Sequence, residues 1–284
     1  MKEKITMEQV VAFTNENNLI LYAAPIMIGL AVLEMFISFR QNKKLYKGKD
    51  FVASLTIGLV QVGLGTLTKS ATFLIVLFLY NIVPWSISVN WFTCILCFFI
   101  LDFLRYWAHR FGHETNVFWA THVTHHNSEQ YNLSTSFRLS WTQQIKLIFF
   151  LPISLMGFNP FVFFICHQIA VLYQFWIHTE YIRKFPKPIE FFFTTPSHHR
   201  VHHGRNPKYL DKNYGSTFII WDRIFGTFQP EMEQADYGIL EQPKGFNPIT
   251  LNFHVWQDIV KNMTQSKTIG QAVKVIFNRP DSLK

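Results

Sequence analysis

Three apolar stretches near the start of the chain predict helices long enough to cross a membrane. Leu19 to Phe39 is interrupted only by Pro25 and Glu34, and Trp91 to Trp107 is a second apolar stretch. Between them, Phe51 to Val83 is apolar over most of its length. A transmembrane helix needs about 20 predominantly apolar residues. We therefore expect spans at about 19–39, 51–83 and 91–107.

The middle stretch has two interpretations with opposite consequences for topology. If Phe51 to Val83 formed two spans, the polar region after Trp107 would lie outside the cell. If it forms one tilted helix, that region lies inside, on the same side as the basic loop Arg40 to Lys49. Thirty-three helical residues would reach about 50 Å. We favour the single helix, with one end projecting beyond the ~30 Å hydrocarbon core.

A later pair of apolar stretches predicts a short helical hairpin. Trp141 to Gly157 and Phe161 to Ile177 are joined by Phe158-Asn159-Pro160. About 16 helical residues reach only roughly 24 Å, so we expect this hairpin to enter the bilayer and return to the same side.

The predicted fold is an all-α integral membrane helical bundle with about three spans, a hairpin at about 141–177 and a cytoplasmic helical cap. The cap comprises residues 108–140 and 178–284 and carries a histidine-rich di-metal site. No repeat or second unit is evident, so residues 1–284 are expected to form one domain. Lys4, Glu8 and Glu16 near the start argue against a cleavable signal.

Composition supports a membrane protein. The chain is 49% hydrophobic and only 15% charged, whereas about a quarter of the residues in a soluble domain are charged. Its net charge of +8 is concentrated in short clusters beside apolar stretches, which favours anionic lipid over nucleic acid as a partner. Cys94, Cys97 and Cys166 lie within apolar stretches and are expected to be free thiols.

Eight of the twelve histidines form three spaced groups. On a helix, residues three or four apart share a face, so each group is expected to direct its rings at one point. Imidazole suits iron, zinc, copper and nickel, and one site uses three or four protein ligands. Eight or nine ligands therefore predict two adjacent metal ions, most simply iron. The groups are His109 and His113, then His122, His125 and His126, then His199, His202 and His203.

The remaining histidines receive separate interpretations. His178 follows an apolar stretch at the rim of the same compartment and is expected to be the ninth ligand. His167 lies about 16 Å deeper on the same face, which favours a substrate channel or packing. His198 is close in angle to His202, so spacing leaves its role open, and His254 is expected to be structural. Because a ligating histidine must be neutral, we expect metal to be lost as the pH falls below about 6.5.

One carboxylate within an apolar stretch is also a candidate. Asp102 lies two helical turns before His109, and charges inside membrane segments are usually functional. We expect it to accept a hydrogen bond from the far nitrogen of a ligating histidine. The alternative is a purely structural pair with Arg105.

Other sequence signatures are missing. No HExxH protease signature, Walker A loop or GxSxG elbow occurs. A membrane metal transporter or zinc-storage protein remains an alternative, although its ligands should line a transmembrane path, and most histidines here lie outside the apolar stretches.

At these residues the chain resembles the fatty acid hydroxylase/sterol desaturase superfamily. The resemblance rests on HRFGH, HVTHH and HHRVHH, followed by Asn213-Tyr214-Gly215 and by WDRIFGTF from Trp221 to Phe228. It spans roughly residues 90–230. Ser128 to Arg138, Leu172 to Glu180 and Thr195 to Gly215 are most similar to members that act on ether lipids of alkylglycerol type.

The resemblance implies a membrane di-iron monooxygenase that acts on a lipid with dioxygen as co-substrate. The alkylglycerol type adds tetrahydrobiopterin and cleavage of the O-alkyl bond, whereas a sterol or fatty acyl hydroxylase or desaturase is the alternative within the superfamily. The family's eight histidines correspond to the three groups above, and its ninth to His178 with Gln174 as polar neighbour. Glu114 also matches the alkylglycerol-type pattern.

Overall fold

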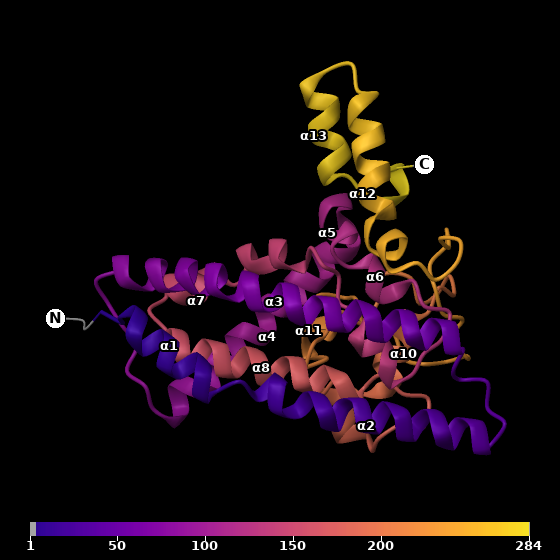
Figure 1. Ribbon diagram of the computed structural model, residues 1–284, viewed down its shortest axis with the longest axis horizontal. Coiled ribbons are helices and arrows are strands. Elements are labelled where there is room, and N and C mark those ends of the chain that lie inside the picture. The colour runs from indigo at the N-terminus through magenta and orange to yellow at the C-terminus, as the bar shows by residue number, and fades with distance from the viewer. Residues whose placement is uncertain (1–3, 284) are drawn as a thin grey trace.

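The computed structural model describes residues 4–283 and is all-helical, with two isolated β-bridges, Phe193–Phe218 and Gly204–Tyr237, as the only extended pairing in that range. The helices of the main bundle lie mainly along the long axis of the molecule (Figure 1). They are α1 (Met7–Glu16), α2 (Leu19–Arg40), α3 (Gly48–Ile82), α4 (Trp91–Glu114) and α8 (Pro160–Trp176).

Polar residues at the helix starts explain where three of these helices begin. Asn18, Asn90 and Asn159 each accept a hydrogen bond from a backbone N–H of the first turn of α2, α4 and α8. Asparagine is favoured there because it satisfies an N–H that the helix leaves free. Helix α8 then packs against α4 and α2. Aromatic rings fill the core between the elements, with Phe73 and Phe164 stacked at 4.1 Å.

Within residues 4–283, two helices are long and apolar enough to cross a membrane, α2 and α4. Their outward faces carry large apolar side chains, among them Ile26, which is 66% exposed, and Phe39, which is 78% exposed. Exposed apolar surface of this extent is typical of contact with lipid or another apolar partner. The predicted all-helical class with span-like helices is therefore confirmed.

The stretch from Phe51 to Val83 is a single helix, as predicted, because α3 runs without a break from Gly48 to Ile82. The two-helix alternative is wrong as a description of the fold. Whether α3 crosses a bilayer, and the side on which the cap lies, stay predictions.

The predicted helical hairpin is correct in its second arm and wrong in its first. Helix α8 covers nearly the whole of 161–177, but the arm from Trp141 to Gly157 is divided into the 3₁₀-helix η2 (Gln143–Phe149) and the short helix α7 (Leu151–Leu155). Pro152 lies in the first turn of α7. Because proline has no N–H and its ring clashes with the preceding turn, it is disfavoured in a helix interior and tolerated in a first turn, which favours the start of a new helix at this point.

Short helices build the region that carries the histidines. Helices α12 (Pro248–Thr264) and α13 (Ile269–Phe277) pack against each other and project together from the bundle (Figure 1). The remaining elements are α5 (Asn116–Ala120), α6 (Val123–His126), η1 (Leu133–Phe137), α9 (Lys187–Phe192), α10 (Pro196–His203), α11 (Ile220–Ile224) and η3 (Pro280–Leu283).

Candidate metal centre

All nine predicted histidines meet in the structure, and they come from four separate segments. They form one group of five and one group of four, and within each group the nearest ligand atoms lie within 4.8 Å of one another. His122 is half-buried and the other eight are buried. The five-histidine group is His109, His113, His122, His126 and His202, and the four-histidine group is His125, His178, His199 and His203.

The expectation that each sequence group points at a single centre is wrong for two of the three. His122 and His126 join the five-histidine group, whereas His125 joins the other. Helix α6 is only four residues long, and His122 precedes it with non-helical backbone. Neighbouring residues on a helix point about 100° apart, so His125 and His126 diverge to the two groups.

Helix α10 divides its histidines in the same way. His199 and His203, four residues apart, share a face and belong to the four-histidine group, while His202 belongs to the five-histidine group. Because α6 and α10 each serve both groups, the groups adjoin: the rings of His126 and His203 lie 4.3 Å apart.

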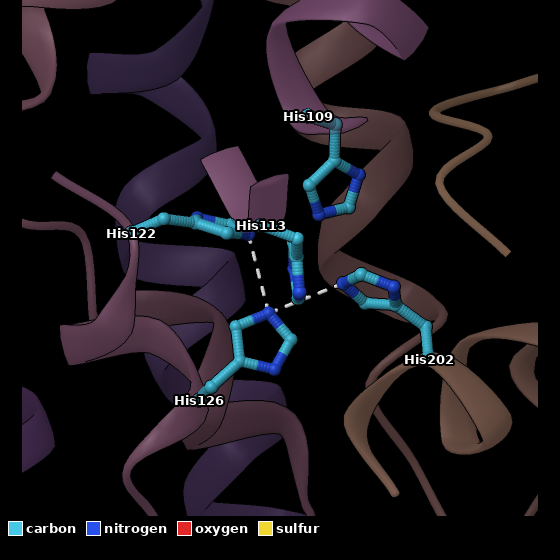
Figure 2. Close-up of side chains that lie close together, drawn as sticks. All are labelled: His109, His113, His122, His126 and His202. Carbon is cyan, nitrogen blue, oxygen red and sulfur yellow. Dashed lines mark hydrogen bonds between the residues drawn. The ribbon is translucent and has the colours of Figure 1, made fainter. Parts of the chain in front are cut away.

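In the five-histidine group the rings converge through their Nε2 atoms (Figure 2). The Nε2 of His126 lies 3.2 Å from that of His122 and 3.1 Å from that of His202. The buried Nε2 atoms of His109 and His113 have no hydrogen-bond partner among the described residues.

The four-histidine group closes into a ring of similar spacing. The Nε2 of His178 is 2.9 Å from that of His199 and 3.1 Å from that of His125. The Nε2 of His203 is 3.1 Å from that of His125 and 3.2 Å from that of His199.

The protons of several rings are fixed on the opposite nitrogen. His109 donates from Nδ1 to the carbonyl of Tyr214 at 2.8 Å, and His178 donates to that of Gln174 at 2.6 Å. His202 donates to the carbonyl of Lys212 at 2.9 Å. In a neutral imidazole this leaves Nε2 with a lone pair, so several lone pairs face one another at close range.

This arrangement fits metal ions. Metal–nitrogen bonds of about 2.0–2.1 Å place neighbouring ligand atoms about 2.9–3.4 Å apart, which includes the observed spacings. A cation between the rings would convert mutual repulsion into coordination and would satisfy the buried nitrogens that have no partner.

Burial also keeps the rings neutral. Loss of hydration, followed by repulsion from neighbouring imidazoles, lowers the pKa of His125, His126, His199 and His203 well below 6.5. Burial lowers the pKa of His178 to about 4. Protonation, and with it the expected loss of metal, is therefore shifted below the pH of about 6.5 expected from the sequence.

The predicted role of Asp102 as the partner of a ligating histidine is wrong. The structural alternative is partly right, because Arg105 interacts electrostatically with this carboxylate but donates its hydrogen bonds to Ser216 and Gln174. The carboxylate accepts hydrogen bonds from the backbone N–H of Thr217 at 2.7 Å and of Phe218 at 3.1 Å, and from the indole of Trp221 at 3.0 Å. It has no hydrogen bond to a histidine among the described residues, because the far nitrogen of His109 is taken by Tyr214. Asp102 instead holds the loop that carries Tyr214.

The other candidates lie around the two groups. Glu114 accepts a hydrogen bond from Arg110 at 2.9 Å and belongs to neither group. His198 faces Glu190 at 3.0 Å, and His167 packs against Phe150 at 5.5 Å. Gln174 supplies its carbonyl to His178, while its side chain accepts a hydrogen bond from Arg105. His254 contacts the carbonyl of Thr250 on its own helix.

The residues that contact the Nδ1 atoms of the histidines were not predicted from the sequence. Asp211 lies 3.6 Å from the Nδ1 of His113, and the carbonyls of Lys212 and Tyr214 hold His202 and His109. Lys146 lies close to both Gly112 and His122. The Asn213-Tyr214-Gly215 signature is visible in the sequence, but backbone carbonyls leave no trace of their role there.

Comparison with known proteins gives concordant matches. The fatty acid hydroxylase family matches residues 94–227, a range that contains all nine histidines. Alkylglycerol monooxygenase of Danio rerio is 37% identical over 97% of this chain and 61% of its own length, and that of Homo sapiens is 38% identical over 91% and 58%. Lathosterol oxidase of Mus musculus is 32% identical over 46% of this chain and 43% of its own length. No solved structure matches.

Fold and site together define a class: an all-helical protein with span-like helices, in which buried histidines form two adjoining groups suited to metal. The chain belongs to the fatty acid hydroxylase family. This confirms the resemblance seen in the sequence. The chain spans about 61% of the length of the Danio rerio relative.

Proposed function

We propose that this chain is a membrane-embedded di-iron oxygenase that hydroxylates a lipid C–H bond, and that its reaction is O-alkyl cleavage of an ether lipid of alkylglycerol type. One observation carries the proposal: imidazoles from four segments converge, through their Nε2 atoms, into two adjoining groups of five and four. A protein that bound a single ion would need only three or four of them.

The nine histidines would hold two iron ions, one in each group. When bound, the pair would supply the redox chemistry that activates dioxygen, the expected co-substrate, toward a lipid C–H bond. The protein's part is to keep Nε2 of His109, His178 and His202 free through their Nδ1–H bonds to backbone carbonyls. Burial of the rings keeps bulk water from the reacting groups.

The proposed topology places α2, α3 and α4 across the bilayer, with η2, α7 and α8 forming a hairpin that enters from the cytoplasmic side. Residues 108–140 and 178–284 then form a cytoplasmic cap, and residues 1–284 form one domain. The apolar outer faces of α2 and α3 support contact with lipid, and the basic residues between Arg40 and Lys49 support a cytoplasmic position for that loop.

The substrate class rests on relatives named alkylglycerol monooxygenase that are 37–38% identical over more than nine-tenths of the chain. Tetrahydrobiopterin is the proposed reductant for that reason. The match to lathosterol oxidase supports the alternative, a sterol or fatty acyl hydroxylase or desaturase, but it covers only 46% of the chain.

The test is a reconstitution. Purified protein loaded anaerobically with ferrous iron should hold about two irons per chain. With tetrahydrobiopterin and dioxygen it should convert a 1-O-alkylglycerol to a fatty aldehyde and glycerol.

Each contrary outcome has a specific meaning. Two irons with turnover only of sterols or fatty acyl lipids, driven by a ferredoxin or cytochrome, would favour the alternative enzyme. Exchangeable zinc without oxygen consumption would favour a metal transporter or storage protein and would contradict the oxygenase.

A further inference from the structure

The turn at residues 211–215 supplies hydrogen-bond acceptors for the Nδ1 atoms of two rings in the five-histidine group. The carbonyls of Lys212 and Tyr214 accept the Nδ1–H bonds of His202 and His109. Asp211 and Asn213 adopt left-handed backbone, each with φ of 57°. This conformation is uncommon for residues other than glycine, so the turn needs support from elsewhere to keep these carbonyls in place.

That support comes from the buried carboxylate of Asp222. It accepts hydrogen bonds from the backbone N–H of Tyr214 and of Gly215, both at 2.7 Å, and from the hydroxyl of Thr227 at 2.6 Å. Asp222 is fully buried. A carboxylate can accept all three bonds because its two oxygens offer about four acceptor positions.

The approach of carboxylate and turn is too close for any side chain at position 215. A Cβ placed on Gly215 would lie 2.9 Å from the Oδ2 of Asp222 and 2.6 Å from the carbonyl of Phe218. Gly215 and Asp222 therefore act together: the missing side chain lets the carboxylate reach the two N–H groups that orient the Tyr214 carbonyl.

In the described part of the chain, no ring of the four-histidine group donates a hydrogen bond to a carbonyl of this turn. His178 is held by Gln174 of α8, and the Nδ1 atoms of His125 and His199 have no hydrogen-bond partner among the described residues. The two groups thus differ in how their rings are held.

From this asymmetry we infer that Asp222 is a positioning residue for one of the two metals, the ion in the five-histidine group. It acts on the carbonyl of Tyr214 through the N–H of Gly215. It acts on that of Lys212 through Thr227, whose backbone carbonyl accepts the N–H of Asn213 at 3.0 Å. Asp222 has no equivalent action on the four-histidine group. The inference rests on the proposed di-metal function and adds that the two metal sites respond separately to changes in this turn.

The experiment measures metal binding rather than turnover. Purified full-length protein is stripped of metal and titrated anaerobically with cobalt(II), whose absorption bands report each site, and bound metal per chain is counted. Wild-type protein should bind two ions. In Asp222→Asn, the amide can accept at one oxygen only and its NH₂ opposes a backbone N–H, so affinity at one site should fall about 10–100-fold, while the other site keeps its affinity and its spectrum.

Two further variants allow the inference to be tested even if Asp222→Asn folds poorly: a milder variant at the same contact and a control elsewhere. Thr227→Val removes one of the three hydrogen bonds and should weaken the same site to a smaller extent. Asp236→Asn removes an exposed carboxylate that pairs with Arg205 at 2.8 Å and does not reach the turn, so both sites should bind as in the wild type.

The outcomes separate the inference from the function on which it rests. If wild-type protein binds no metal, the proposed function fails. If wild-type protein binds two ions and Asp222→Asn and Thr227→Val bind both equally well, or lose both equally, the positioning role is overturned and the metal centre stands.

Discussion

At the scale of single residues, the property that matters for each histidine is which ring nitrogen is free. The backbone carbonyls of Lys212, Tyr214 and Gln174 take the Nδ1–H of three rings and leave their Nε2 atoms pointing inward. Metal-binding histidines generally have such a partner, and its loss typically costs 10–100-fold in affinity or activity.

Replacing one histidine of each group should remove different metals. His202→Ala takes a ligand from the five-histidine group and His125→Ala from the four-histidine group, so each variant should lose about one metal per chain and all measurable turnover, while the protein still inserts into the membrane. Metal counting and the aldehyde assay check this. His254→Ala, whose ring bonds within α12, is the matched control and should keep both metals. Full activity in either group variant would refute the metal assignment.

The pH dependence of the metal-free protein follows from the lowered pKa values. Burial holds the pKa of His178 at about 4 and those of His125, His199 and His203 well below 6.5. Below pH 6.5 the unfolded chain therefore binds more protons than the folded one, and stability falls as the pH falls. His178 alone contributes a loss on the order of 3 kcal/mol by pH 4.

Thermal unfolding of stripped protein between pH 8 and pH 5 checks that sign. The melting temperature should decrease steadily as the pH falls below 6.5. A melting temperature that rises with acidity would show that these rings are protonated in the folded protein and would contradict their neutral state.

At the scale of elements, hydrogen bonds connect the long helix α3 to the segment that follows the histidine-bearing helix α6. Arg138, which is fully buried, donates to Asp50 and to Asn127, each at 2.6 Å, and to Ser54 at 2.9 Å. Asp50 and Ser54 lie on α3, and Asn127 directly follows His126. This one side chain thus joins α3 to the end of α6.

Breaking that junction should be costly. Arg138→Leu leaves the buried Asp50 carboxylate without its counter-charge, and removal of one partner of a buried pair typically costs about 3–5 kcal/mol. Thermal or denaturant unfolding in detergent measures the loss. The control is Arg205→Leu, which breaks a more exposed pair with Asp236 and should cost less than about 1 kcal/mol. Equal losses in the free energy of unfolding would show that the Arg138 junction stabilises the protein no more than the exposed Arg205 pair does.

At the scale of the whole molecule, the proposed topology places the loop between α2 and α3 on the same side as the histidine-bearing cap. Lys44 and Lys208 are exposed in these two regions, and Ser88 is exposed between α3 and α4. The native cysteines are buried or half-buried, so an introduced surface cysteine should dominate labelling.

Labelling of intact cells with a membrane-impermeant thiol reagent tests this arrangement. Ser88→Cys should react from outside, whereas Lys44→Cys and Lys208→Cys should react only after the cells are opened. Reaction of Lys208→Cys from outside would contradict a cytoplasmic cap, and opposite behaviour of Lys44→Cys and Lys208→Cys would contradict the even number of crossings between them.

The helical class, the continuity of α3, the position of α8 and the identity of the nine histidines could all be predicted from the sequence. These follow from local properties: apolar stretches of spanning length, capping residues, and imidazoles at short spacing. The sequence did not determine the break before α7, because the apolar pattern from Trp141 to Gly157 outweighed the single Pro152 in the prediction.

The division of the nine histidines between the two groups depends on tertiary packing and could not be predicted from spacing. Spacing assigned His122, His125 and His126 to one point, but the short helix α6 directs two of them to one group and the third to the other. The role of Asp102 and the contacts of Asp222 also depend on segments more than a hundred residues apart, or on backbone N–H groups and carbonyls that every residue possesses. Side-chain identity is local information, whereas the direction of a ring and the partner of a carboxylate are set by packing between distant parts of the chain.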